Sequence, residues 1–316
     1  MEANGAKLVN NRTRTDRAGL AYGLAAYGLW GLMPFYIHSV EGFPPMQMLA
    51  HRIAWCALLM FAIVALRRRP DLVADALLPR KLFLLTLSSF LIALNWFAYI
   101  LGVTTNQVTQ ASLGYFMTPL LNVLLGVCLL GERLRPIRWI ALGIATIGLG
   151  YLMAVRQEMP WIALQVGTSF SLYGLVRKIT PVDSLVGLLI ETLILLPFAL
   201  VFISYWQISG TGVFGTNIRQ DGLIMLSGVV TAVPLLCFTN AARRLPLTVM
   251  AFLQYIAPSI QLLLAVVVYK EPFEPVKQVT FGLIWVGLAL FTMDSIRVAQ
   301  QGKRDKVDSP GQDEAG

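Results

Sequence analysis

Two charged side chains lie inside apolar runs that are long enough to cross a membrane. Arg52 lies in the run 46–66 and Glu191 in the run 185–205. An ionisable side chain at membrane depth costs at least about 2.5–3.5 kcal/mol on insertion scales, so it should face a cavity or a partner. We therefore expect Arg52, with neighbouring His51, and Glu191 to contact a solute or to gate its path. The alternative is that they snorkel or bond to nearby backbone.

The residue patterns of intramembrane enzymes and metal sites are missing from the sequence. The chain has two histidines in all and no HExxH motif, and Glu191 is the one carboxylate deep in an apolar run. The three cysteines, Cys56, Cys128 and Cys237, lack the spacing of a metal site or a disulfide framework. No GxxxxGK[ST] loop is present for ATP. We expect no enzyme activity, no metal, no cofactor and no ATPase subunit.

The composition shows which solvent surrounds these residues. Of 316 residues, 56% are hydrophobic and 13% are charged, against roughly 25% charged in an average soluble domain. Apolar runs of about 18 or more residues are typical of membrane spans, and ten are present, at 19–37, 46–66, 82–102, 109–130, 137–155, 159–176, 185–205, 222–242, 247–269 and 278–296. The sequence predicts an all-α polytopic membrane protein with ten transmembrane helices and a lipid bilayer as its partner.

The basic residues orient these spans. Twenty of the 25 Lys and Arg residues lie in the N-terminal arm, in the loops after spans two, four, six and eight, and in the C-terminal tail. The intervening loops hold four, and Arg52 is the remaining one. The positive-inside rule then places both termini in the cytoplasm. This distribution also accounts for the formal net charge of +8 without a nucleic-acid partner.

The two halves of the chain repeat each other. At an offset of 139 residues, spans two to five align with spans seven to ten, and the aligned pairs include Arg52 with Glu191, Pro119 with Pro258 and Glu132 with Glu271. Five spans per half force the second half to enter the bilayer inverted, as in secondary transporters. The expected organisation is a basic cytoplasmic arm, two five-helix repeats and a disordered cytoplasmic tail, at 1–18, 19–155, 156–299 and 300–316. Two inverted bundles enclose a cavity near the midplane.

Two prolines point to the middle of this cavity. Pro119 and Pro258 lie mid-span, where each removes one intrahelical hydrogen bond, which predicts a helix break or a packing kink. Aromatic and amide side chains near them suit an amphipathic organic solute, although lipid-facing aromatic residues are also common. The further candidates for the solute path are Trp30, Asn95, Trp96, Tyr99, Tyr115, Phe116, Tyr173, Gln254 and Tyr255.

The remaining charges near span ends have simpler explanations. Arg177 and Lys178 end span six on the cytoplasmic side, where topology alone explains them; Arg177 is also placed to capture an anionic solute. Glu132, Glu271 and Asp294 follow or end apolar runs, and we expect them to be solvated.

Several segments together resemble a known family. They are HR at 51–52, NW at 95–96, ASLGYF at 111–116, TPLLNVLLG at 118–126, GERLR at 131–135, YGLVRK at 173–178, LLIETL at 188–193, VPLLCFT at 233–239 and FLQYIAP at 252–258. The chain resembles the EamA branch of the drug/metabolite transporter superfamily, and most closely its RarD proteins. This resemblance implies a bacterial inner-membrane protein of ten helices, built as two inverted five-helix units, that moves small organic molecules.

These observations predict a secondary transporter that works by alternating access through a central cavity. The solute is expected to be a metabolite, an amino acid or a drug-like compound. As a hypothesis, Glu191 exchanges a proton with the cytoplasm, so protons are the candidate coupling ion. An uncoupled facilitator, a channel or a lipid scramblase shares the same composition, and a structural membrane protein is the third reading.

Overall fold

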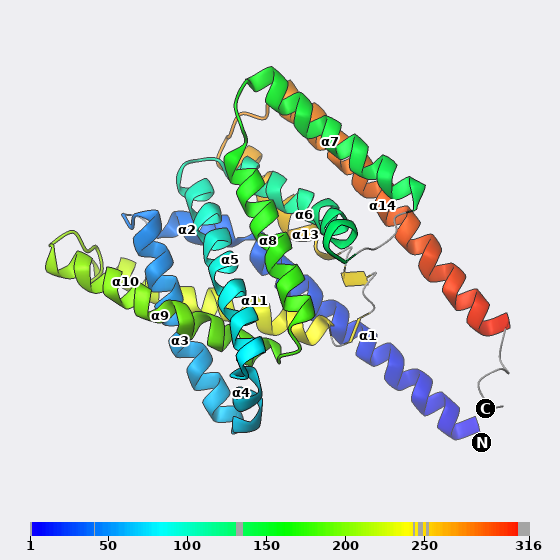
Figure 1. Cartoon of the computed structure of the whole chain (residues 1–316), viewed down its shortest axis with the longest axis horizontal. Coiled ribbons are helices and arrows are strands. Elements are labelled where there is room, and N and C mark those ends of the chain that lie inside the picture. The colour runs from blue at the N-terminus through cyan, green and yellow to red at the C-terminus, as the bar shows by residue number, and fades with distance from the viewer. Residues whose placement is uncertain are drawn as a thin grey trace.

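A computed structural model of the chain describes residues 2–40, 42–130, 135–242, 244–245, 249–250 and 253–308. Its elements are helices (Figure 1). They are α1 (Glu2–Gly31), α2 (Met33–Ser39), α3 (Pro45–Arg67), α4 (Pro70–Ala76), α5 (Pro79–Thr104), α6 (Val108–Leu130), α7 (Pro136–Arg156), α8 (Trp161–Ile179), α9 (Ser184–Ile208), α10 (Ile218–Met225), α11 (Ser227–Ala242), α13 (Ile256–Leu263), the π-helix η1 (Leu264–Val268) and α14 (Pro275–Asp308).

Proline and side-chain caps set many of the helix starts. The helices α3, α4, α5, α7 and α14 each begin with proline, whose missing N–H is not needed in a first turn. The Asp183 side chain accepts hydrogen bonds from the first amides of α9, and Asn217 does the same for α10. Pro34 lies in the first turn of α2, where a new helix starts after Leu32. The predicted single span 19–37 is therefore bent by 41° between α1 and α2.

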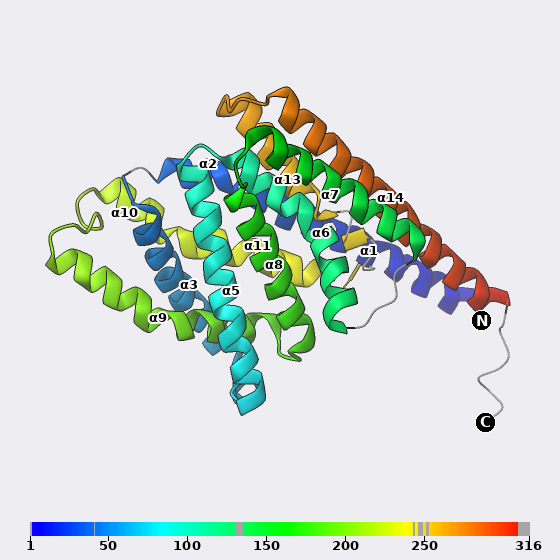
Figure 2. The same ribbon diagram turned by 45° about the horizontal axis from the view of Figure 1, so that its top comes forward.

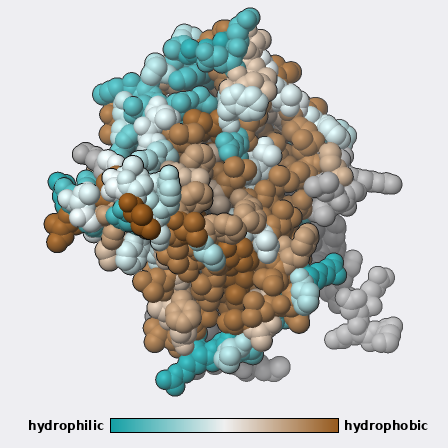
Figure 3. Space-filling view, turned by 60° about the vertical axis from the view of Figure 1, so that its left-hand side comes forward, coloured by the Kyte–Doolittle hydropathy of each residue, from teal (hydrophilic) through white to brown (hydrophobic). Residues whose placement is uncertain are grey.

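Among the residues that the structure describes, six helical segments are long and apolar enough to cross a membrane, and the bent pair α1 and α2 makes a seventh. They are Pro45–Arg67, Pro79–Thr104, Pro136–Arg156, Ser184–Ile208, Ile218–Ala241 and Pro275–Asp294. Each of the ten predicted runs is helical where the structure describes it, apart from short breaks at 32, 159–160, 226, 254–255 and 269, but the count of ten crossings stays a prediction. Figure 3 shows a broad apolar band across one face, with hydrophilic residues gathered above and below it. The chain is therefore a multi-pass membrane protein.

The helices pack in matched pairs that follow the sequence repeat. Helix α5 packs on α8 and α9, and its repeat equivalent α11 packs on α1 and α3. In the same way α6 packs on α8, and α13 packs on α1. The equivalent helices α3 and α9 pack on each other, as do α7 and α14, which run side by side along one edge of the molecule (Figures 1 and 2). These pairings are what two interlocked halves related by a pseudo-two-fold axis produce.

Glycine allows close approach at the α6–α8 crossing. A Cβ added to Gly114 of α6 would lie 2.6 Å from the carbonyl oxygen of Ala163 on α8, and one added to Gly167 of α8 would lie 2.9 Å from the carbonyl oxygen of Gly114. Small residues let helix backbones approach in a membrane, where packing and not water drives association. The α6–α8 crossing therefore depends on both glycines.

The C-terminal end of the chain differs from its prediction. Helix α14 continues to Asp308, whereas the sequence predicts a disordered tail from residue 300. Residues 300–308 include Gln, Lys, Arg and Asp, and most of these are good helix formers that extend an existing helix without a new nucleus. Residues 309–316 lie outside the described part of the chain.

Candidate functional site

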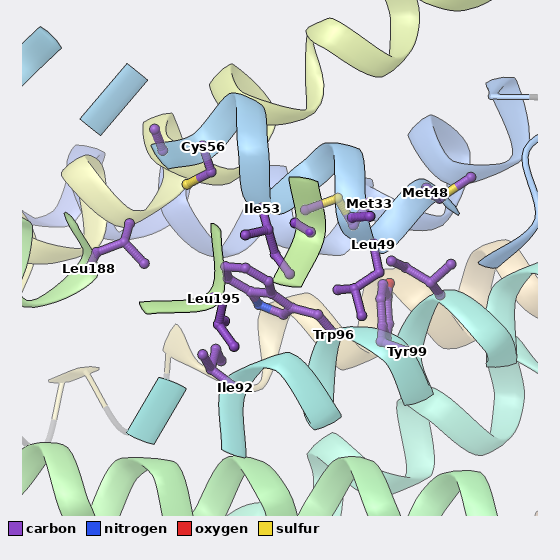
Figure 4. Close-up of a cluster of buried hydrophobic side chains, with 14 of the residues drawn as sticks. Met33, Met48, Leu49, Ile53, Cys56, Ile92, Trp96, Tyr99, Leu188 and Leu195 are labelled. Atoms are coloured by element: carbon purple, nitrogen blue, oxygen red, sulfur yellow. The ribbon is translucent and has the colours of Figure 1, made fainter. Parts of the chain in front are cut away.

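Arg52 forms the first of two buried charged centres. It lies on α3 with 7% of its surface exposed. Its Nε–H donates to Thr231 Oγ1 of α11 over 3.0 Å, and its guanidinium lies over the ring of Trp96 of α5, 4.4 Å from the centroid. Figure 4 shows that Trp96 reaches from α5 to a place between Ile53 and Leu195. The cation is thus held by a hydroxyl and an aromatic face. We call Arg52, Thr231 and Trp96 the Arg52 site.

The Arg52 site contains no carboxylate. None of the ion pairs between residues that the structure describes includes Arg52. Its electrostatic neighbours are instead the Cys56 thiol and the hydroxyls of Tyr36, Tyr99 and Tyr115. A buried charge is stabilised mainly by an opposite charge and by hydrogen bonds, and Arg52 has only the second of these within the described chain.

A satisfied amide network supports one wall of this site. Asn95 of α5 donates from Nδ2 to the Val166 carbonyl over 2.9 Å and to Ser169 Oγ over 3.2 Å, both on α8. Its Oδ1 accepts from the hydroxyl of Tyr115 of α6 over 3.2 Å. The Tyr115 ring packs 5.7 Å from that of Tyr99. Asn95 therefore has the partners expected for a mid-span amide, and it joins α5, α6 and α8.

Glu191 forms the second centre, and it is fully buried on α9. Its carboxylate accepts from Ser88 Oγ of α5 over 2.5 Å and from the hydroxyl of Tyr173 of α8 over 3.3 Å. The Arg177 guanidinium of α8 lies 3.6 Å from Oε1 and supplies an opposite charge. A Cβ at Gly187 would overlap that guanidinium, so the glycine makes room for it. We call Glu191, Ser88, Tyr173 and Arg177 the Glu191 site.

Other predicted path residues lie in different surroundings. His51 stacks on Phe214 with ring centroids 4.8 Å apart, and it meets Phe43 edge-on, so the imidazole packs in an aromatic cluster. Trp30 packs against Tyr27 and Phe238. Phe116 and its repeat equivalent Tyr255 stack on each other with centroids 6.4 Å apart. These residues therefore contribute to packing in this conformation.

The two prolines behave differently. Pro119 lies inside the continuous helix α6, whereas Pro258 stands in the first turn of α13, after turn residues Gln254 and Tyr255. Proline is tolerated in a first turn because its N–H would have no partner there. Within the described residues, the helix is therefore interrupted at the second proline and not at the first.

Two acids expected to be solvated are buried and bound. Glu271 has 6% of its surface exposed, and its carboxylate accepts from the amides of Val108 and Thr109 over 2.6 and 2.8 Å. The first amides of α6 lack helical partners and attract a negative charge. Asp294 is 3% exposed and pairs with Arg138 over 2.7 Å and with Arg135 over 3.3 Å. Solvation was the wrong prediction for both; Glu132 lies outside the described residues.

Sequence reasoning also missed the hydroxyl partners of both centres. Thr231 and Ser88 bind Arg52 and Glu191, but each is one of many small polar residues in an apolar run. The repeat offers one signal for where to look for these partners. The hydroxyl that binds Arg52 comes from span eight, and the hydroxyl that binds Glu191 comes from the equivalent span three. The helix rotation that aligns them is set by packing and not by the local sequence.

Two surface cavities open at the end of the bundle that the charge distribution predicts to be outside. One of about 240 Å³ is lined by Phe35, His38, Ser39, Arg219, Gln220 and Tyr269. The other, of about 220 Å³, lies between residues around Thr109, Arg156 and Lys277. Neither is lined by Arg52 or Glu191. Both charged centres are therefore closed off from these cavities in this conformation.

Known proteins are similar to this chain over nearly all of its length. A model of the EamA-like transporter family matches residues 17–154. The protein RarD of Salmonella typhi is 43% identical over 285 residues, 90% of this chain and 97% of that protein. A Vibrio cholerae protein described as an uncharacterized transporter is 39% identical over 290 residues, 91% of this chain and 96% of that one. A crystal structure at 19% identity has a similar fold, with a TM-score of 0.57 over 89% of this chain and 98% of that one.

Proposed function

Because the chain belongs to the EamA-like transporter family, which also includes its RarD relatives, we propose that it carries a small organic solute across the bacterial inner membrane by alternating access. It is a membrane transporter, and the proposal adds the mechanism and the class of solute. The energy would come from a solute or ion gradient, since the sequence has no nucleotide-binding loop.

One observation carries the mechanism. The two membrane-depth charges, Arg52 and Glu191, stand at equivalent positions on α3 and α9, two equivalent helices that pack on each other. Buried charges within spans mark substrate and ion pathways, because they are costly elsewhere. Inverted repeats place such residues near the midplane, where opening of either end in turn gives access from one side.

Alternating access includes a stage in which contacts between helices separate the solute site from both sides of the membrane, and two contacts of the described conformation suit this role. At the predicted outer end, Gln47 of α3 donates to the Thr211 carbonyl over 2.9 Å and accepts from the Val213 amide over 3.1 Å. Deeper in the bundle, Glu191 and Ser88 join α9 to α5. Solute access from outside would separate the first contact, and access from the cytoplasm would rearrange the second.

Glu191 is the candidate for proton coupling. It is the deep carboxylate of the spans, and its partners are two hydroxyls and one cation. Protonation would remove its attraction to Arg177 and leave a neutral group that both hydroxyls still bind. Loss of this ion pair gives a proton a direct means of loosening α8 from α9.

The experiment is solute counterflow in proteoliposomes. A thermal-shift screen of the purified protein against amino acids, nucleosides, organic acids and amphenicols first selects a ligand, because binding raises the melting temperature by mass action. Liposomes loaded with that compound should then accumulate its radiolabelled form saturably. Flux that is linear in the gradient and shows no exchange would favour a channel, and lipid transfer without solute exchange would favour a scramblase.

A cross-link tests alternation itself. Gln47→Cys combined with Thr211→Cys places two thiols on either side of the outer contact, and a bifunctional thiol reagent that spans the gap left by the shorter side chains should hold that end shut. Counterflow should stop after treatment with a reagent whose spacer is a disulfide, and it should return when that spacer is reduced. Each single variant, treated in the same way, is the matched control. Undiminished exchange in the cross-linked protein would contradict opening at this end.

A further inference from the structure

The buried charges of the described chain do not balance. Four charged residues of the described chain are buried: Arg52, Glu191, Glu271 and Asp294. Each of the three acids has its own partners. Glu191 pairs with Arg177, Glu271 accepts from the first amides of α6, and Asp294 pairs with Arg135 and Arg138. Arg52 is the buried charge that is left without an opposite charge or a helix end among the described residues.

The two equivalent positions of the repeat differ in whether the buried charge has an opposite charge beside it. Glu191 occupies the same position in its half as Arg52 does in the other, and it has a cation at 3.6 Å. Arg52 has a hydroxyl on Nε and a ring beneath it, while the hydrogen bonds among the described residues do not engage its two terminal amino groups. A guanidinium fork of this kind matches the two oxygens of a carboxylate.

The walls of the site are apolar and aromatic. Trp96 and Tyr99 both reach from α5 toward α3 (Figure 4), and Tyr115 packs beside Tyr99. The buried hydroxyl of Tyr99 has no hydrogen-bond partner within the described chain. A ligand placed here would meet one cation, one free hydroxyl and several ring faces, which suits an anion with an apolar body.

From this imbalance we infer that the transported solute is an organic anion whose carboxylate pairs with Arg52 and whose apolar body lies against Trp96 and Tyr99. The inference rests on the transport function proposed above and adds the chemical class of the solute. The missing negative charge is then supplied by the cargo, so that the site is electrically complete only when it is loaded.

The cavity of about 240 Å³ is a fitting entrance for such a solute. Its lining holds Arg219 and His38 and no acid. Three of its polar atoms, His38 Nε2, Gln220 Oε1 and the Tyr269 hydroxyl, are buried without a hydrogen-bond partner in the described chain. The cavity therefore offers an anion one cation and several polar atoms that have no partner in the described chain, at the predicted outer end.

Matched pairs of acids and amides test the sign of the solute. The purified full chain is melted with benzoate and benzamide, with indole-3-acetate and indole-3-acetamide, and with octanoate and octanamide. At least one carboxylate should raise the melting temperature by about 2 °C or more, and its amide should not. This shift should disappear in Arg52→Gln. No shift with any carboxylate, an equal shift with the amide, or a shift that survives Arg52→Gln would overturn the inference.

The unliganded protein gives a second readout that does not need a ligand. Removal of an uncompensated buried charge should leave the melting temperature of Arg52→Gln equal to or above that of the wild type. Arg138→Gln is the matched control, because its guanidinium pairs with buried Asp294 and its loss should lower the melting temperature. A fall in Arg52→Gln as large as that control would mean that the fold already neutralises Arg52, against the inference.

The outcomes separate this inference from the proposed function. Saturable counterflow of a neutral or cationic compound, with no effect of any carboxylate, would keep the transporter and remove the organic anion. Carboxylate binding that depends on Arg52, without counterflow of the bound compound, would keep the anion site and remove alternating access for that solute.

Discussion

Arg52 of α3 and Glu191 of α9 are equivalent residues of the two halves, and each is bound by a hydroxyl from the opposite half. Thr231 of α11 holds Arg52, and Ser88 of α5 holds Glu191. Helices α11 and α5 are themselves equivalent in the repeat. A movement of one half against the other therefore strains both contacts together, so that each charged centre senses the relative position of the halves.

The Thr231 contact predicts a strong dependence on one hydroxyl. Thr231→Val keeps the shape of the side chain but leaves the Nε–H of buried Arg52 without an acceptor. We expect the free energy of unfolding to fall by about 1–3 kcal/mol. Thr231→Ser keeps the hydroxyl and should lie close to the wild type. Thermal melting of both variants in one detergent makes the comparison.

A double-mutant cycle identifies the cause of that loss. In Arg52→Gln the charged donor is gone, so the further change Thr231→Val should lower stability by less than it does in the wild type. Strictly additive losses would show that Thr231 stabilises α11 by some other contact.

Gly187 controls the ion pair of the Glu191 site. In Gly187→Ala the new methyl group would overlap the Arg177 guanidinium, the flexible end of its side chain, and should displace it from Glu191. We expect a loss of about 1–3 kcal/mol, similar to that in Arg177→Gln. The two changes together should cost no more than either alone, because both remove the same contact.

The matched control for this substitution is Gly174→Ala on α8. A Cβ at Gly174 meets nothing within 4 Å, so this variant should be at least as stable as the wild type. Additive losses from Gly187→Ala and Arg177→Gln would contradict the displacement of the guanidinium.

Glu191→Gln tests the role of the carboxylate in coupling. The amide oxygen still accepts hydrogen bonds from Ser88 and Tyr173, but the side chain no longer titrates. We expect counterflow of the compound selected by thermal shift to lose the pH dependence that it shows in the wild type, because the group proposed to exchange the proton is gone. A pH profile with the shape of the wild-type profile would remove Glu191 from proton exchange.

The sequence was informative about features that depend on a single residue or a single apolar run. Apolar length predicted the helices, and the cost of charge at membrane depth singled out Arg52 and Glu191 before any partner was visible. The offset of 139 residues aligned these two residues and predicted which helices are equivalent. The packing of α3 on α9 and of α7 on α14 follows that equivalence.

The parts that could not be predicted depend on how helices rotate against each other. Glu271 and Asp294 follow or end apolar runs, where solvation is the simple expectation, and yet each meets donors from α6 or α7 that are more than 150 residues away. The bend at Leu32 was missed because proline two residues on is compatible with a continuous span. His51 packs on Phe214 from a loop whose position no local pattern specifies.

The cap on α6 predicts that one glutamate near the membrane edge matters far more than its neighbour. Glu271→Ala leaves the amides of Val108 and Thr109 buried without their acceptor, and we expect a loss of about 2–3 kcal/mol. Glu274→Ala removes an exposed pair with Arg156, which is worth at most about 1 kcal/mol. The ratio of the two losses in thermal melting is the measurement. Equal losses of stability in the two variants would mean that water, and not the amides of α6, solvates the Glu271 carboxylate in the membrane-embedded protein.

The α6–α8 crossing predicts that one glycine substitution is damaging. In Gly114→Ala the methyl group would lie 2.6 Å from the carbonyl oxygen of Ala163, and a backbone atom cannot rotate away as a side chain can. The helices must separate, and we expect a loss of about 1–3 kcal/mol and a lower melting temperature. Gly143→Ala is the control, because its Cβ meets nothing within 4 Å, and alanine favours the helix by up to about 1 kcal/mol. A Gly114→Ala variant as stable as Gly143→Ala would mean that α6 and α8 do not cross this closely.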